Sequence, residues 1–319
     1  MTYIGFDIGG TKCAACLGQK REGGIDIVKK HAFPTPKTWR EAVEALFRAA
    51  ETLLGEHGEP VSACGFSCGG PLDSAKGLVM SPPNLPGWDN VPLVQLAEER
   101  FHVPAFLEND ANACALAEWR WGAGQGTHSM AFLTFGTGLG AGLILDDRLL
   151  RGANGNAGEI GHIRLAPFGP AGYGKEGSFE GFCSGGGLAQ MAVTLGRRAV
   201  QNGQKCAYLE NGYEAVTTKA VALAAYAGDE TALEVFERCG EKLGEGLSVL
   251  VDVINPEAIV IGSVFTRCED LIRPAMERVM ARECLGASLK AVRVLPAQLG
   301  EAIGDYAALC AAEYGLSCQ

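Results

Sequence analysis

Two segments of the chain combine small turn residues with side chains that suit phosphate chemistry. Residues 3–18 read YIGFDIGGTKCAACLG, and residues 130–145 read MAFLTFGTGLGAGLIL. Each is an apolar run, a turn with Gly and Thr, and a second apolar run, which predicts a β-hairpin with small residues at its tip. Glycine lets several backbone N–H groups approach a bulky anion from one side. Two such hairpins predict a duplicated design that grips a polyphosphate.

Asp7 stands just before the first turn, where a carboxylate beside a phosphate cradle is expected to hold Mg²⁺. The chain has no G-x-x-x-x-G-K-[ST] phosphate loop, and G-T-G-L-G at 136–140 does not fit the dinucleotide pattern G-x-G-x-x-G. A plain tight turn is the alternative for either hairpin taken alone. The candidate phosphate-binding residues are Asp7, Gly9, Gly10, Thr11, Lys12, Thr137 and Gly138.

A third polar group, Asn109-Asp110, falls where PAFLENDANACALAEWRWG (104–122) passes from a predicted strand into a predicted helix. Either residue is a good helix N-cap by type, and on spacing alone a cap is the favoured interpretation of Asp110.

The elements that must position these residues alternate between strands and helices. Residues 37–60 have helical spacing and end at Gly-Glu-Pro, and residues 61–73 predict a buried strand that runs into a Gly-Gly-Pro turn. Residues 166–187 predict a long loop, helices fill most of 188–253, and a helix returns at 304–315. Predicted strands and helices therefore mix throughout the chain.

Composition narrows the classes of function. A chain of 319 residues is long enough for two domains, and a net charge of -10 argues against an extended nucleic-acid surface or an anionic membrane as partner. No stretch approaches the roughly 20 apolar residues of a membrane span, and the N-terminus does not resemble a signal peptide. We therefore expect a cytoplasmic protein whose 12 scattered cysteines are reduced.

Taken together, the motifs resemble those of the ROK family of sugar kinases and sugar-responsive repressors. The resemblance rests on Asp7-Ile8-Gly9-Gly10-Thr11-Lys12, Asn109-Asp110, Gly136-Thr137-Gly138, Gly158-Glu159-Ile160-Gly161-His162 and Asn255-Pro256 followed by Ile259-Val260-Ile261-Gly262. The motifs occur in the family's order and span essentially the whole chain.

The resemblance implies an actin-like ATPase (ribonuclease H-like) fold, with two α/β domains and a central cleft for nucleotide and sugar. We expect the smaller domain to comprise 1–118 and the C-terminal helix 304–319, and the larger domain to comprise 119–303. A homodimer is expected from the family alone.

Roles for individual residues also follow from the resemblance. It implies that Asp110 is the catalytic base, and that Gly262 and Ser263 lie on the adenosine side of the ATP site. The family tends to have Gly-Gly where this chain has Gly262-Ser263. The implied sugar-binding residues are Gly70, Asn84, Asn109, Asp110, Glu159, His162 and Glu180, with Asn84 the weaker candidate.

This sequence departs from the family's pattern at a metal-binding motif. The family usually has a structural zinc site, built from the G-H histidine and three cysteines in C-x-C-G-x-x-G-C-x-E. Here residues 171–180 read AGYGKEGSFE, which keeps both glycines and the terminal glutamate but has none of the three cysteines. Cys183 lies nearby, but one cysteine and one histidine do not complete a tetrahedral zinc site. We expect a protein without zinc, in which Tyr173 and Phe179 pack where the metal would organise the loop.

The resemblance implies an ATP- and Mg²⁺-dependent hexose kinase that transfers the γ-phosphoryl group to a sugar hydroxyl, with O6 of glucose the first choice. Mannose, allose, fructose, N-acetylmannosamine and N-acetylglucosamine remain open as substrates. A sugar-sensing repressor of the same family is the alternative from another class, and it would need a DNA-binding segment before the first hairpin, for which Asp7 leaves no room. A filament or chaperone ATPase is disfavoured by the sugar-type motif at 158–162.

Overall fold

The computed structural model describes residues 1–318, which divide into two compact units. Unit 1 comprises Met1–His128, Gly142–Ala157 and the segment from Gln298 onward. Unit 2 comprises Ser129–Ala141 and Gly158–Ala297. This division places 119–128, 142–157 and 298–303 in unit 1, whereas the predicted boundaries placed them in the larger domain.

Among its described residues, unit 1 contains one five-stranded sheet, a short second sheet, the antiparallel strand pair β9–β10 and four longer helices. Its elements are β1 (Thr2–Ile8), β2 (Lys12–Arg21), β3 (Gly24–Pro34), α1 (Trp39–His57), β4 (Val61–Cys68), β5 (Leu72–Asp73), β6 (Leu78–Val79), α2 (Leu93–Phe101), β7 (Ala105–Asn109), α3 (Asp110–Trp121), β9 (Ala141–Leu145), β10 (Arg148–Leu149), the 3₁₀ turn η4 (Gly300–Ala302) and α10 (Ile303–Ser317).

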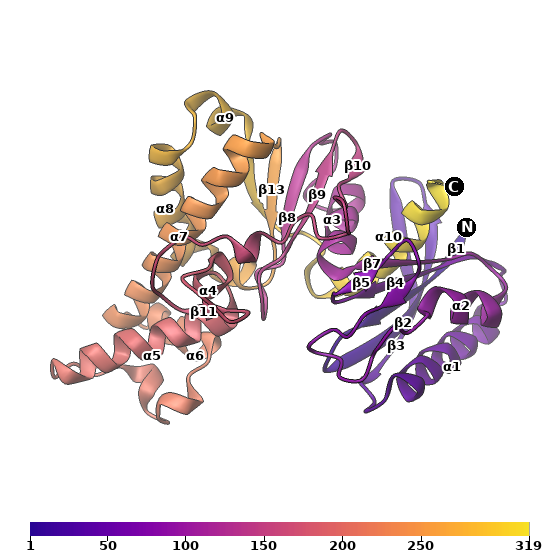
Figure 1. Cartoon of the computed structure of the whole chain (residues 1–319), viewed down its shortest axis with the longest axis horizontal. Coiled ribbons are helices and arrows are strands. Elements are labelled where there is room, and N and C mark those ends of the chain that lie inside the picture. Colours follow the sequence, from indigo (N-terminus) through magenta and orange to yellow (C-terminus); the bar gives the residue numbers. More distant parts are fainter. Residues whose placement is uncertain (319) are drawn as a thin grey trace. The chain divides into compact units, whose positions relative to one another are not determined.

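The main sheet of unit 1 has the order β3-β2-β1-β4-β7, with β1 antiparallel to β2 and parallel to β4. Ile4 and Phe6 of β1 pack in a core with α1 and α2, whereas Tyr3 packs with α10 on the opposite face (Figure 1). Alternation along a strand places Asp7 on the same face as Tyr3. The pleat of β1 thus directs Asp7 toward α10.

Local signals explain where several helices of unit 1 begin and end. Thr38 and Glu41 form a capping box at the start of α1, and Gly58 ends the helix in a left-handed conformation. Asn109 caps α3, because its side chain accepts a hydrogen bond from the backbone N–H of Ala111. The helix predicted within 37–60 is confirmed as α1. Of the two candidates for the cap, the structure has Asn109, and Asp110 is the first residue of α3.

Unit 2 contains a parallel set of strands and most of the chain's helices. Its elements are β8 (Met130–Leu133), η1 (Ile160–His162), β11 (Ala171–Gly172), β12 (Lys175–Glu176), α4 (Phe179–Phe182), α5 (Gly185–Gln201), η2 (Ala207–Leu209), η3 (Tyr213–Ala215), α6 (Thr218–Tyr226), α7 (Glu230–Ile254), β13 (Ala258–Ile261), α8 (Val264–Glu283), α9 (Gly286–Ala291) and β14 (Arg293–Pro296).

In unit 2, β13 lies between β8 and β14 and runs parallel to both. The long helix α7 packs against α8, and α4, α5 and α6 also contact α7 (Figure 1). Gly240 and Gly244 of α7 lie against backbone carbonyls of α8, so the two helices approach closely there. Among residues 1–318, no helix has both the length and the apolar character needed to cross a membrane.

Candidate functional site

The first hairpin, β1–β2, ends in a turn with unused backbone donors. Gly9 donates its N–H to the carbonyl of Lys12 at 3.0 Å. Among the described residues, the N–H groups of Gly10 and Thr11 have no hydrogen-bond acceptor. Thr35, which sequence reasoning missed, braces the turn because its hydroxyl donates to the carbonyl of Gly9 at 2.6 Å. Adjacent free N–H groups of this kind form an anion-binding surface.

The second predicted turn follows β8 and has the same property. Thr134 donates its N–H to the carbonyl of Gly140, and Gly136 donates to the carbonyl of Gly138. Within residues 1–318, the N–H groups of Thr137 and Gly138 find no acceptor. Both units therefore present a Gly-Thr turn with two consecutive backbone donors free for an anion.

Asp7 lies at the start of α10 in unit 1. A Cβ added to Gly304 would stand 2.5 Å from its carboxylate, so only glycine leaves room there. Burial, and next the nearby Asp305, raise the pKa of Asp7 to about 6, while Lys30 opposes the shift. Asp305 is itself buried and forms an ion pair with Lys30. A partly buried carboxylate in this setting is suited to a bound cation, because the cation would offset the cost of its charge.

Asp110 and Asn109 occupy the strand-to-helix junction between β7 and α3. Oδ1 of Asp110 accepts a hydrogen bond from the N–H of Ala111 at 2.8 Å. Its Oδ2 has no donor among the described residues, and it faces Gly69 of the loop after β4. Loss of hydration raises the pKa of the Asp110 carboxyl, and the hydrogen bond from Ala111 opposes that rise. One carboxylate oxygen is thus fixed and the other is free to accept a proton.

Gly70 and Asn84 are the remaining sugar-binding candidates of unit 1. A Cβ added to Gly70 would stand 3.3 Å from Nδ2 of Asn109, so the structure brings the Gly70 and Asn109 candidates together. The carbonyl oxygen of Asn84 lies 2.6 Å from where a Cβ of Gly10 would be. Asn84 therefore lines the first phosphate turn.

In unit 2, the motif at 158–162 forms a tight turn that exposes two polar side chains. Gly158 has φ 93°, and a Cβ there would overlap the carbonyl oxygen of Ala141. Glu159, which precedes the single-turn η1, and His162, its last residue, are both exposed. The ring of His162 meets that of Tyr173 edge-to-face, with 5.2 Å between the ring centroids.

Glu180 lies against the second Gly-Thr turn. Its Oε2 accepts a hydrogen bond from the N–H of Leu139 at 2.9 Å and would stand 2.7 Å from a Cβ on Gly138. A Cβ on Gly161 would approach the Glu180 side chain at 3.3 Å. The structure thus joins Glu180, Gly138 and the 158–162 turn into one group within unit 2.

Gly262 and Ser263 follow β13. Gly262 donates its N–H to the carbonyl of Leu133 at 3.0 Å. Ser263 has φ 52° just before α8, in the left-handed region that favours glycine. A Cβ added to Gly136 would stand 3.4 Å from Oγ of Ser263, which places this pair beside the second Gly-Thr turn.

The segment 166–187 is more ordered than the predicted loop. β11 and β12 form a small hairpin whose turn is Tyr173-Gly174, and α4 follows directly. Ser178 caps α4 by accepting the N–H of Gly181 at 3.1 Å, and the ring of Phe179 is buried against Gly246 of α7. The buried thiol of Cys183 lies 3.6 Å from the carbonyl of Cys239.

These residues do not fit a zinc ion. Ser178 is buried as a helix cap, and within residues 1–318 no group of three or more His, Cys, Asp or Glu side chains is placed to hold a metal. Tyr173 packs on His162 and Phe179 on α7, which gives the hairpin contacts of its own. Whether the protein binds zinc in solution stays a prediction to test.

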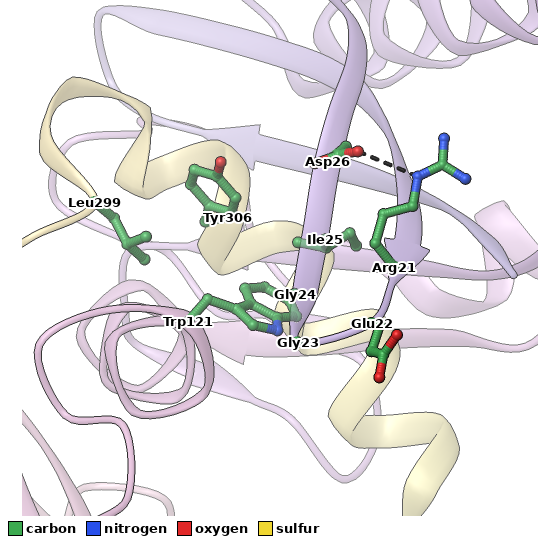
Figure 2. Close-up of a pocket in the computed structure, with 9 residues that line it drawn as sticks. All are labelled: Arg21, Glu22, Gly23, Gly24, Ile25, Asp26, Trp121, Leu299 and Tyr306. Carbon is green, nitrogen blue, oxygen red and sulfur yellow. Dashed lines mark hydrogen bonds and ion pairs between the residues drawn. The ribbon is translucent and has the colours of Figure 1, made fainter.

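A separate pocket lies in unit 1, between the Arg21–Asp26 turn and the side chains of Trp121, Leu299 and Tyr306 (Figure 2). Trp121 and Tyr306 line it as a tilted ring pair with 6.1 Å between their centroids. None of the residues predicted for phosphate or sugar lines this pocket. We assign it no part in the reaction.

Comparisons with known proteins agree with these motifs. A model of the ROK family matches residues 3–312. A glucokinase of Streptomyces coelicolor is 33% identical over 304 residues, which are 94% of this chain and 94% of that protein. A ROK hexokinase from Thermus thermophilus has a TM-score of 0.81 and 32% identity, and the match covers 100% of both chains.

A ROK family glucokinase from Streptomyces griseus, solved in complex with glucose and AMPPNP, has a TM-score of 0.79 and 33% identity. That match covers 99% of this chain and 100% of that one. The predicted α/β fold of the actin-like ATPase type is confirmed by these likenesses.

Proposed function

Because the chain belongs to the ROK family, we propose that it is an ATP-dependent hexose kinase, with O6 of glucose as the acceptor to test first. The observation that carries the proposal is the half-fixed carboxylate of Asp110. Its Oδ1 is held by the N–H of Ala111, whereas Oδ2 has no donor among residues 1–318. A catalytic base needs this combination of fixed orientation and one available oxygen.

Asp110 would accept the proton of the attacking sugar hydroxyl as the new bond to phosphorus forms. Phosphoryl transfer depends mainly on positioning and charge stabilisation, so the nucleophile must be held in line and relieved of its proton. The raised pKa of Asp110 supports this role, since a more basic carboxylate accepts a proton more readily.

We assign sugar recognition to candidates from both units. Asn109 with Gly70 in unit 1, and Glu159, His162 and Glu180 in unit 2, offer both donors and acceptors to hydroxyl groups. Asn84 is the weaker candidate because its carbonyl lies at the first phosphate turn. Which hexose these groups select, an N-acetylhexosamine included, is left to the substrate panel described below.

The two Gly-Thr turns would bind the phosphates of ATP. The free N–H groups of Gly10 and Thr11, and those of Thr137 and Gly138, fit an anion in both units. Lys12 adds a positive charge at the first turn, and Gly262 and Ser263 would lie on the adenosine side. Asp7 would hold Mg²⁺, which when bound neutralises charge on the phosphates.

The proposal includes the wider organisation of the protein. We propose that the two units are the two domains of the family fold, with the C-terminal helix returning to the first. The homodimer and the cytoplasmic location stay predictions from the family resemblance.

A panel of sugars with ATP and Mg²⁺ tests the proposal. The panel contains glucose, mannose, allose, fructose, N-acetylmannosamine and N-acetylglucosamine, with release of ADP measured by a coupled assay and the phosphorylated carbon identified by NMR. We expect phosphorylation of at least one hexose, glucose at O6 first. If no sugar stimulates ADP release, the kinase proposal is wrong, and sugar binding without turnover would favour the sensor alternative.

A further inference from the structure

In unit 1, an ion pair between the buried Glu108 and the partly exposed Arg151 lies beside the junction that carries the candidate base. We propose that Glu108 and Arg151 are positioning residues that hold Asn109 and Asp110 in their working orientation. This inference rests on the proposed kinase function. Neither residue is expected to touch the substrates, and both act through the backbone and side chains that they hold.

Glu108 is the penultimate residue of β7, immediately before Asn109, and it is 3% exposed. Its Oε1 accepts the backbone N–H of Asn109 at 3.1 Å and Nδ2 of Asn112 at 3.1 Å. The hydroxyl of Ser74 is a weaker donor to the same oxygen at 3.4 Å. One carboxylate is therefore hydrogen-bonded both to the backbone just before Asp110 and to a side chain in the first turn of α3.

Arg151 holds the other oxygen of this carboxylate. Its Nε and Nη2 donate to Oε2 of Glu108 at 3.0 and 2.7 Å. The guanidinium also lies 5.8 Å from the ring centroid of Tyr314 in α10. Both donors of the planar guanidinium converge on this one oxygen, and they fix its position more closely than a single contact does.

The surrounding residues offer no substitute for the contacts that Glu108 and Arg151 make. Asn112 is 3% exposed and its Oδ1 has no partner among residues 1–318, so Glu108 is the contact that orients its amide. Without Arg151, Glu108 would be a buried carboxylate with only neutral donors. We infer that loss of either residue lets the Asn109–Asp110 junction shift. A shift of about 1 Å in a reacting group can slow turnover by roughly 100-fold.

The test compares Arg151→Gln, Arg151→Lys and Glu108→Gln in steady-state kinetics, with folding checked by thermal unfolding. For Arg151→Gln we expect kcat to fall roughly 10- to 100-fold, while KM for ATP changes by no more than about two-fold. Arg151→Lys should recover part of kcat, because it keeps the charge but only one contact. The double variant Glu108→Gln/Arg151→Gln should lose little more than the worse single variant, since the two side chains act as a unit.

Arg100→Gln is the matched control. Arg100 likewise donates from Nε and Nη2 to one glutamate, Glu51, at 2.6 and 3.0 Å, but it joins α2 to α1 on the surface of unit 1. Its loss should leave kcat unchanged. The side chain of Arg151 is 44% exposed, so its variants carry the test even if Glu108→Gln does not fold.

Two results would overturn the inference. One is a folded Arg151→Gln variant with the kcat of the wild type. The other is a loss in which KM for ATP rises in step with the fall in kcat, as general loosening of the fold would produce. A wild-type protein that phosphorylates no sugar would instead contradict the proposed function, so the two failures are distinguishable.

Discussion

At the scale of single residues, Asp110 is the side chain on which the proposed reaction depends. In Asp110→Asn, the amide oxygen can still accept the N–H of Ala111, but the free position can no longer take a proton. We expect kcat to fall by roughly 10²- to 10⁴-fold, the usual contribution of a general base. Calorimetry should show sugar affinity largely retained.

The exposed Asp26 of the same unit provides the control, because Asp26→Asn changes charge equally and lies outside the predicted site. Near-normal turnover in Asp110→Asn would remove Asp110 from the mechanism.

Asp7 makes a prediction about pH and stability. Burial and Asp305 raise its pKa from 3.8 to about 6 in the folded state. The folded protein therefore disfavours the charged carboxylate, and the penalty develops as pH rises from about 4 to about 6 and persists above. This pKa shift corresponds to a cost in the free energy of unfolding. Because Asp7 keeps partial exposure to solvent, we reduce that cost to roughly 2 kcal/mol.

Asp7→Asn should accordingly be more stable than wild type at pH 7.5 without magnesium, by roughly 2 kcal/mol, and equal to it near pH 4. Urea unfolding at the two pH values measures the difference. A stability gap that does not change with pH would contradict this account. The same variant should lose the use of Mg²⁺ with ATP.

At the scale of elements, the turn that begins the 158–162 motif depends on glycine. Gly158 and Gly155 both have positive φ, 93° and 86°, but a Cβ at Gly158 would overlap the Ala141 carbonyl whereas Gly155 faces open space. Gly155→Ala should cost about 1 kcal/mol of unfolding free energy from backbone strain alone, and Gly158→Ala clearly more, about 3 kcal/mol. If urea unfolding shows the same loss of stability in both variants, the close approach of Gly158 to the Ala141 carbonyl makes no contribution to stability.

The small hairpin β11–β12 carries the prediction about zinc. Ser178 serves as a helix cap and Phe179 is buried against α7, so the segment has a core of its own. Metal analysis of pure protein should find far less than one zinc per chain. Treatment with a chelator, followed by magnesium, should leave activity intact. Stoichiometric zinc that is lost in His162→Ala or Cys183→Ala would prove the prediction wrong.

At the scale of the whole molecule, the residues assigned to each substrate are divided between the two units. We therefore expect the sugar and the nucleotide to bind with positive coupling, because each ligand favours the conformation that the other needs. The coupling of affinities must be reciprocal. Calorimetry with a non-hydrolysable ATP analogue should show tighter binding when a sugar substrate is present.

His162→Ala should weaken this coupling by weakening sugar binding, whereas Tyr213→Phe, far along the chain in η3, should leave it unchanged. Equal affinities for the analogue with and without saturating sugar, together with unchanged small-angle scattering, would exclude coupling between the two substrates.

The sequence by itself determined the features that depend on neighbours along the chain. Alternating apolar residues around Gly and Thr encode both turns, and Asn109 caps α3 because its side chain reaches a backbone N–H two residues away. The absence of cysteine from residues 171–180, where the family resemblance implies a zinc motif, is likewise read directly from the sequence. Such signals are local, since a turn or a cap is decided by the residues that form it.

Only the tertiary structure decided the contacts that join distant segments. Glu108 and Arg151 are 43 residues apart, Lys30 and Asp305 are 275 apart, and Thr35 reaches Gly9 across 26 residues. No spacing rule predicts these pairs, because the packing of strands and helices brings them together. The order of segments in the sheet placed Asp7 beside α10, and the return of the chain through β10 placed Arg151 behind the Asp110 junction. The sequence thus indicates which residues can do the chemistry, while the packed fold fixes how they are held.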